Sequence, residues 1–143
     1  MTSTVVYQGG LRTECIHLRS GSAIETDAPA DNQGLGERFS PSDLVATALG
    51  SCMLTIMGMR AVDMNVNLEG VKIEVEKLMK PEPRRISGIN LTFHFPASLA
   101  LTERQQIILQ KAAETCPVKY SIHPDIALDI NFNFNPVAVP DPA

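Results

Sequence analysis

Residues 40–64, SPSDLVATALGSCMLTIMGMRAVDM, decide the fold. Ser40 is suited to cap a helix, Pro41 to its first turn, and Asp43 to the third position, where an acidic side chain completes a capping box. The residues that follow are apolar on every side of a helical projection, which is typical of a helix buried all round. The stretch therefore predicts a long core helix from Pro41 to Met64.

Short strands are expected before this helix. Thr4–Gln8, Leu11–Leu18 and Ala23–Thr26 are rich in residues that favour strands. Glycine-containing turns at Gly9-Gly10 and Ser20-Gly21-Ser22 separate them. The N-terminal third is thus predicted to be a set of three short strands.

Strands and helices are both expected after the central helix. Val71–Lys77 alternates apolar and polar residues, as a half-buried strand does, and Ile86–Phe95 is its predicted partner. Two helices, opening at Thr102 and at Pro117, and a last strand over Ile126–Phe134 complete the order. This order predicts an α+β fold with antiparallel sheets around a long central helix.

Length and composition suit one soluble domain. The chain has 143 residues, 44% of them hydrophobic and 20% charged. We expect a single domain over residues 1–135 and a flexible, proline-rich tail over 136–143. The net charge of −4, without a basic run, argues against nucleic acid and anionic membranes as partners.

The N-terminus and the longest apolar run bear on location. The start, MTSTVVYQGG, has no basic segment followed by an apolar core, so a signal peptide is not predicted and a cytoplasmic location is expected. The longest apolar run, Leu44–Met59, is shorter than the ~20 residues of a membrane span. A buried core helix is the preferred interpretation, with no membrane association.

The chain has three cysteines, and none belongs to a CxxC pair. An odd number without a secretion signal argues against a disulfide scaffold, and the spacing lacks a zinc pattern. Cys52 lies in mid-helix, where a lone cysteine most often acts as a small buried apolar residue. Cys116 precedes Pro117 at a predicted helix start, where the helix dipole favours a thiolate. Cys15, on a strand without an obvious cation, is predicted to be unreactive.

Histidines and arginines supply the other candidates. His123 follows Cys116 closely and could form a Cys–His pair, but no further metal ligands stand at suitable spacing. Arg12, Arg19 and Arg38 are cations that could pair with a thiolate, and the residues alone do not rank them.

Two stretches, FSPSDLVATALGSCM (39–53) and TCPVKYSIHPD (115–125), resemble the superfamily of osmotically inducible protein C and organic hydroperoxide resistance proteins, OsmC/Ohr. The first matches the family's proline-started central helix with a cysteine, and the second its Cys-Pro helix start. The order of strands and helices is also similar over nearly the whole chain. The resemblance implies an intertwined homodimer with active sites at the subunit interface.

The resemblance also implies a reaction. Cys52 would be the peroxidatic thiolate that reduces an organic hydroperoxide, and Cys116 the thiol that resolves it to a disulfide, without metal or cofactor. A dithiol reductant, of lipoyl type or similar, would regenerate the pair. The segment GERF selects Arg38 as the cation that holds the thiolate. One departure is Ser42, which stands where the family commonly has a glutamate that pairs with this arginine.

Two other functions are compatible with the residues. One is a non-enzymatic protein that binds an apolar ligand on the same fold, with idle cysteines. The other is a thiol hydrolase or acyl-transfer enzyme that uses Cys116 with His123 and does not depend on Cys52.

Overall fold

The computed structural model describes residues 1–135, so the predicted flexible tail, 136–143, lies outside the described residues. Contacts divide the chain within its central helix into two compact units, Met1–Val45 and a second that begins at Ala46. Each unit is described by itself, and a single domain over residues 1–135 stays a prediction.

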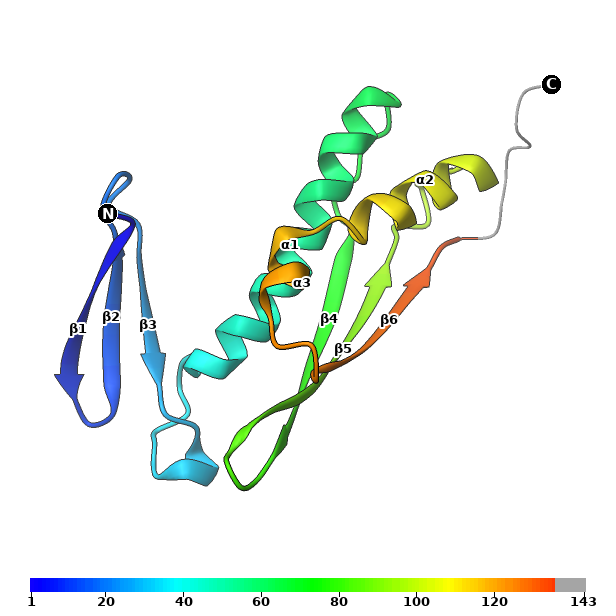
Figure 1. Cartoon of the computed structure of the whole chain (residues 1–143). Helices are drawn as coiled ribbons and strands as arrows, with labels where there is room; N and C mark the ends of the chain where they lie inside the picture. The colour runs from blue at the N-terminus through cyan, green and yellow to red at the C-terminus, as the bar shows by residue number, and fades with distance from the viewer. Residues whose placement is uncertain (136–143) are drawn as a thin grey trace. The chain divides into compact units, whose positions relative to one another are not determined.

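The predicted elements occur in the predicted order (Figure 1). Their ends agree with the sequence pattern to within a few residues, which confirms the α+β class. The strands and helices are β1 (Ser3–Gly9), β2 (Arg12–His17), β3 (Ala23–Asp27), α1 (Pro41–Asp63), β4 (Lys72–Lys80), β5 (Arg85–His94), α2 (Glu103–Ala113), α3 (Pro117–Ser121) and β6 (Ala127–Asn133). A short 3-10 helix, η1 (Ala30–Asn32), was not predicted.

The first unit contains an antiparallel sheet in the order β1-β2-β3. Gly9 and Gly10 have φ angles of 84° and 60°, which let the chain turn tightly between β1 and β2. Val5, Cys15 and Ile24 stand opposite one another across the three strands and share a face. Val5 is 63% and Ile24 50% exposed, so the sheet leaves apolar side chains uncovered.

The start of α1 is capped as predicted. The backbone N–H of Ser40 donates to Asp43 Oδ2 at 2.9 Å, and the N–H of Asp43 donates to Ser40 Oγ at 3.0 Å. These reciprocal bonds form a capping box, which satisfies two of the free N–H groups at the helix end.

The second unit is built on a mixed sheet in the order β4-β5-β6. β4 and β5 are antiparallel, but β5 and β6 are parallel, so the expectation of purely antiparallel sheets is wrong for this pair. The physical reason is the connection: after β5 the chain crosses back through α2 and α3 before it enters β6 in the same direction (Figure 1).

The core of the second unit lies between α1 and this sheet. Adding a Cβ atom at Gly50 would place it 3.5–3.6 Å from side chains of Ile73, Val75 and Leu91, so α1 approaches the sheet closely there. The buried α1 residues recur every three or four positions and form one stripe. They are Ala46, Leu49, Gly50, Met53, Met57 and Ala61.

The rest of α1 is uncovered in the single chain, so its burial all round, which the sequence leads us to expect with the help of a second chain, stays a prediction. Val45, Met59 and Val62 are 40%, 62% and 76% exposed. One sheet covers one face of a helix, so an apolar circumference is buried only in part. The 23-residue helix is long and apolar enough to cross a bilayer, a criterion that core helices of soluble proteins also satisfy.

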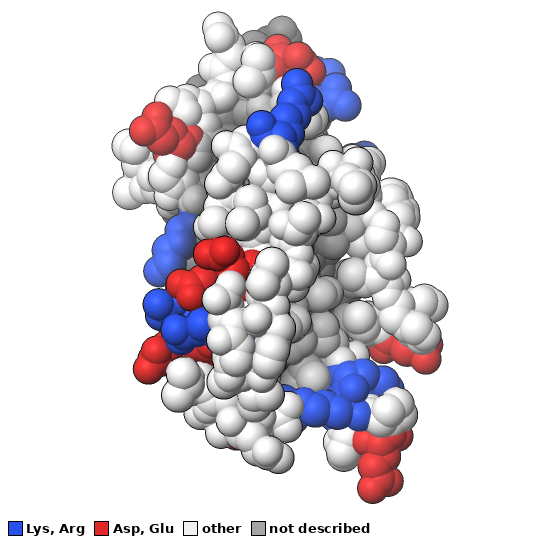
Figure 2. Space-filling model, turned by 90° about the vertical axis from the view of Figure 1, so that its left-hand side faces the viewer, with Lys and Arg blue, Asp and Glu red and all other residues white. Residues whose placement is uncertain are grey.

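Charged side chains are mixed in sign on the face shown in Figure 2. Lysine and arginine lie in small groups beside aspartate and glutamate, separated by wide uncharged areas. This face therefore carries no extended field of one sign.

Candidate active site

The second unit brings two free thiols together. Cys52, on α1, and Cys116, just before α3, both belong to the core between the helices and the sheet. Cys116 is fully buried, whereas Cys52 is partly exposed. The Cys52 side chain lies close enough to the Cys116 thiol to raise its pKa. Two cysteines far apart in the sequence thus form one dithiol site.

The junction of α2 and α3 positions Cys116. Its backbone N–H donates to Ala113 O at 3.3 Å, and Thr115 Oγ1 donates to Ala112 O at 2.7 Å. Cys116 is the N-cap of α3, as predicted, and Pro117 follows at the first helical position. The turn between the two helices therefore holds the thiol in the core.

The pKa of Cys116 is raised, contrary to the expectation that a helix start would favour its thiolate. Burial is the largest cause, because it penalises the charged form, and the hydrogen bond with Cys52 adds to it. Backbone N–H groups of Val118 and Lys119 act in the opposite direction but are outweighed. Cys116 is therefore held as a thiol, which can donate to the Cys52 sulfur.

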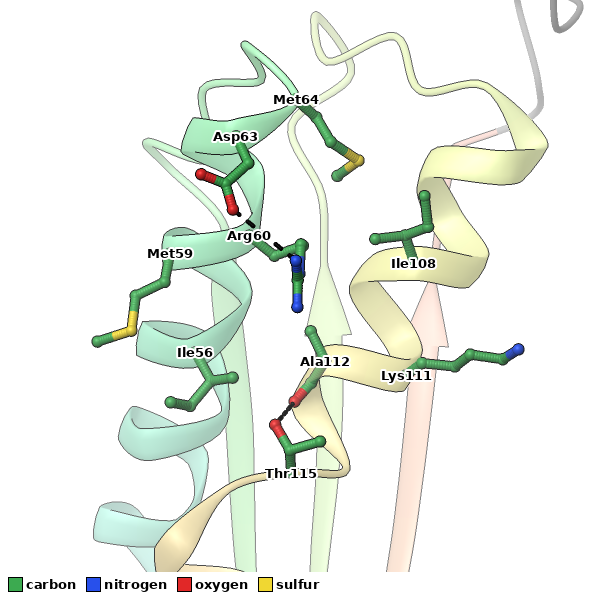
Figure 3. A pocket seen from close by; sticks show the side chains of 9 residues that line it. All are labelled: Ile56, Met59, Arg60, Asp63, Met64, Ile108, Lys111, Ala112 and Thr115. Atoms are coloured by element: carbon green, nitrogen blue, oxygen red, sulfur yellow. Dashed lines mark hydrogen bonds and ion pairs between the residues drawn. The ribbon is translucent and has the colours of Figure 1, made fainter.

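A groove of about 710 Å³ lies between the C-terminal half of α1 and α2 (Figure 3). Ile56, on its wall, is one helical turn beyond Cys52, and Thr115 directly precedes Cys116. The wall is mainly apolar, so the groove suits the organic part of a ligand. It is lined by Ile56, Met59, Arg60, Asp63, Met64, Ile108, Lys111, Ala112 and Thr115.

The groove has a polar edge on α1. Arg60 Nη1 lies 3.8 Å from Asp63 Oδ2, and both side chains are more than half exposed (Figure 3). Sequence reasoning did not predict this groove. The sequence does contain an indication of the α1 wall of this groove. Cys52, Ile56 and Arg60 follow one another at intervals of four residues, which places them on one face of the helix.

Arg12 is engaged in an ion-pair cluster of the first unit. Its Nε and Nη2 donate to the two carboxylate oxygens of Asp27 at 2.7 and 2.8 Å, and Nη2 also donates to Glu37 at 3.2 Å. This bidentate pair lowers the pKa of Asp27, whose side chain is only 1% exposed. Arg12 thus holds a buried carboxylate in place.

Arg38 is held more loosely. Its Nε donates to Glu25 at 3.4 Å and its Nη1 to the Glu37 carbonyl at 3.2 Å, and 43% of its side chain is exposed. Arg19 is exposed as well. The three arginines belong to the first unit and both thiols to the second, so the role of Arg38 toward Cys52 stays a prediction. Ser42, where the family commonly has a glutamate, lies 3.3 Å from Ser40 Oγ through its own hydroxyl.

His123 is exposed, and its Nδ1 accepts the backbone N–H of Asp125 at 3.0 Å. The groups that act on the Cys116 thiol are Cys52, Val118 and Lys119. The structure therefore offers no support for a Cys116–His123 hydrolase. Within residues 1–135, no three side chains of His, Cys, Asp or Glu are placed to hold a metal ion.

The raised pKa and burial of Cys116 predict an order of alkylation in the reduced, native protein. Cys116 should react with iodoacetamide more slowly than Cys52, since thiolate is the reactive form and burial also blocks access. Its rate should rise only as the pH exceeds the ordinary thiol range. Peptide mass spectrometry at a series of pH values measures this, with the urea-unfolded chain as the control in which the difference should vanish. Equal native rates at Cys52 and Cys116 would contradict the prediction.

Comparison with known proteins gives the family. The family model described as OsmC-like protein matches residues 34–131, more than half of the chain. A solved structure from Psychrobacter arcticus 273-4, provisionally described as an osmotic stress induced and detoxification response protein, is 50% identical. The match covers 93% of this chain and 96% of that one, with a TM-score of 0.89. A search of curated proteins gave no match.

More distant structures share the fold. An organic hydroperoxide resistance protein OsmC from Legionella pneumophila is 18% identical, with a TM-score of 0.71 and coverage of 94% of this chain and 98% of that one. The organic hydroperoxide resistance protein OhrB of Bacillus subtilis is also 18% identical, with a TM-score of 0.63 and coverage of 93% and 98%. With the family model and the Psychrobacter relative, these similarities show that the chain belongs to the OsmC-like family of the OsmC/Ohr superfamily.

Proposed function

We propose that this protein is a cytoplasmic thiol peroxidase that reduces organic hydroperoxides through Cys52 and Cys116. The observation that carries the proposal is the pair of neighbouring free thiols in the core of the second unit, with an apolar groove lined by residues that follow Cys52 and precede Cys116 in the chain. The names of the Legionella and Bacillus structures, which refer to organic hydroperoxide resistance, are consistent with this chemistry.

The proposed reaction uses the two thiols in sequence. The Cys52 thiolate attacks the terminal peroxide oxygen, the O–O bond breaks, and the alkoxide takes up a proton and leaves as an alcohol. Cys52 is then a sulfenic acid. The Cys116 sulfur attacks the Cys52 sulfur and displaces water, which forms the disulfide. A dithiol reductant of lipoyl type or similar returns both thiols by exchange and is itself oxidised to a disulfide.

The environments of the two sulfurs favour this division of roles. Cys52 is the partly exposed thiol, and Ile56 of the groove wall is one helical turn further along α1. Cys116 is buried, is held as a thiol by its raised pKa, and is a direct neighbour of Cys52. A sulfenic acid at Cys52 would therefore form within reach of its resolving partner.

The groove favours organic peroxides over hydrogen peroxide. Its walls carry the apolar side chains of Ile56, Met59, Met64 and Ile108. Burying an alkyl or aryl group against them removes apolar surface from water, which makes the binding free energy more favourable. Hydrogen peroxide has no apolar part to bury. The same groove is the one observation that favours a non-enzymatic binder of an apolar ligand, which would leave both cysteines without a chemical role.

We further propose that the protein works as an intertwined homodimer. Val45, Met59 and Val62 on α1, and Val5 and Ile24 on the first sheet, are apolar and at least 40% exposed in the single chain. A second copy that covers these surfaces would remove the cost of exposing them to water.

Serine substitutions separate the peroxidase from the binder. Cys52→Ser should abolish consumption of cumene hydroperoxide in the presence of dihydrolipoamide, because the attacking sulfur is gone. Cys116→Ser should consume about one equivalent and then stall, because the sulfenic acid has no internal thiol to resolve it. Cys15→Ser is the matched control and should keep full activity. A Cys52→Ser variant as active as the parent would exclude the mechanism, and an inactive parent that still binds the alcohol product would favour the binder.

Arg38 is proposed to stabilise the Cys52 thiolate. Arg38→Met should slow the oxidation of Cys52 by roughly 100-fold, the usual scale for loss of one electrostatic contact in an active site. The rate is measured by stopped-flow mixing with hydroperoxide, and circular dichroism checks that the fold is retained. Arg19→Met is the matched control. If Arg19→Met is slow and Arg38→Met is not, the role belongs to Arg19, and if neither is slow, Arg12→Met is the remaining test.

The homodimer is tested by light scattering at micromolar concentration. The parent should have the mass of two chains, and Val62→Asp should shift the population toward monomer, because a carboxylate would be buried at the interface. Ile107→Asp is the control, since it adds the same charge at an exposed apolar position of α2. A monomeric parent would refute the dimer.

A further inference from the structure

A second, smaller cavity lies away from the dithiol site. It has a volume of about 280 Å³ and forms where the turn end of the β4–β5 hairpin meets the segment between α3 and β6. None of its lining residues belongs to the groove between α1 and α2. This cavity, here called the hairpin cavity, is lined by Lys80, Arg85, Ile86, His123, Asp125 and Ile126.

Two cations of the hairpin cavity face each other. Lys80 and Arg85 are directly opposite in the register of β4 and β5. Like charges at directly opposite positions of a strand pair repel, which destabilises the pair. The described part of the chain contains no carboxylate ion-paired to either side chain. The protein has a net charge of −4, so this uncompensated positive site is a local exception.

Arg85 keeps donors free for a ligand. Its Nη1 donates to the carbonyls of Pro81 and Pro83 at 3.2 and 2.7 Å, which fixes the guanidinium at the turn. The Nε and Nη2 donors are not used by these bonds. Arg84 adds a third cation nearby, since it lines an adjacent hollow together with Lys80.

His123 contributes a further donor. Because its Nδ1 accepts the N–H of Asp125, the neutral ring carries its proton on Nε2. Asp125 is the acidic member of the lining, and its carboxylate lies 3.8 Å from His123 Nδ1 with 82% of the side chain exposed. Two permanent cations against one well-solvated carboxylate leave the cavity positive.

We propose that the hairpin cavity binds the oxyanion group of a small molecule, a phosphate monoester or a carboxylate. Lys80 and Arg85 supply the charge, and the planar guanidinium can donate two parallel hydrogen bonds to such a group. His123 supplies an Nε2–H donor, and Ile86 and Ile126 provide half-buried apolar contact for the rest of the molecule. The bound anion would remove the repulsion between the two opposed cations. The proposal does not depend on the thiol chemistry.

Thermal unfolding of the full chain tests the site. Inorganic phosphate and acetate are the probes, and sodium chloride at matched ionic strength is the control for screening. The Tm of the parent should rise with one of the oxyanions in a saturable way, as expected for a ligand that binds the folded state. The oxyanion that raises the Tm more identifies the kind of group that the cavity binds. When this oxyanion is added, the nuclear magnetic resonance signals of the backbone amides of Lys80, Ile86 and His123 should shift.

Two lysine variants make the test specific. Lys80→Met should reduce the oxyanion-dependent rise in Tm at least severalfold, and without any oxyanion at low salt it should be no less stable than the parent, because the repulsion is relieved. Lys72→Met, on the same strand but outside the cavity, should respond as the parent does. An equal rise in sodium chloride, or an undiminished phosphate and acetate response in Lys80→Met, would overturn the proposal.

Discussion

The close packing of α1 on the β4-β5-β6 sheet is the constraint on which the second unit depends. Gly50 lets the helix backbone approach Ile73, Val75 and Leu91, and the stripe from Ala46 to Ala61 follows the sheet from there. Cys52 lies two residues beyond Gly50 and is therefore held at the flank of the buried stripe. This position leaves it partly exposed and close to Cys116.

The two thiols differ because the same packing treats them differently. Cys116 is enclosed by the core, and the cost of charging a buried sulfur exceeds the benefit of the N–H groups at the start of α3. Cys52 is only partly buried. The two cysteine side chains are chemically identical, but they differ in burial. Proteins commonly use such differences in environment to give paired titratable groups different roles.

Local signals in the sequence predicted the elements well. The capping box at Ser40 and Asp43 and the one at Thr102 and Gln105 mark two helix starts, and the Cys116-Pro117 step marks a third. These helix starts can be predicted from the sequence because a helix cap is formed by residues that are close together in the chain. The cysteine positions and helix starts also carry the family resemblance, so the sequence alone identifies the candidate thiols.

Properties that depend on distant contacts were not predicted. The alternation of β6 gives the face of each residue but not the direction of the strand, so the parallel pairing with β5 was missed, although two intervening helices are the usual sign of a crossover. The raised pKa of Cys116 arises from packing that local patterns do not specify. The opposed cations Lys80 and Arg85 became visible only with the register of the hairpin.

The parallel pairing of β5 with β6 also has a kinetic consequence. Cys116 lies inside the crossover that joins these strands, so its burial requires contacts between segments far apart along the chain. Such high-contact-order pairings form late, because the entropy of closing a long loop must be overcome first. The β4–β5 hairpin can form from local contacts, whereas the dithiol site is assembled only when β6 docks. The two cysteines are therefore expected to become neighbours only after the β4–β5 hairpin has formed.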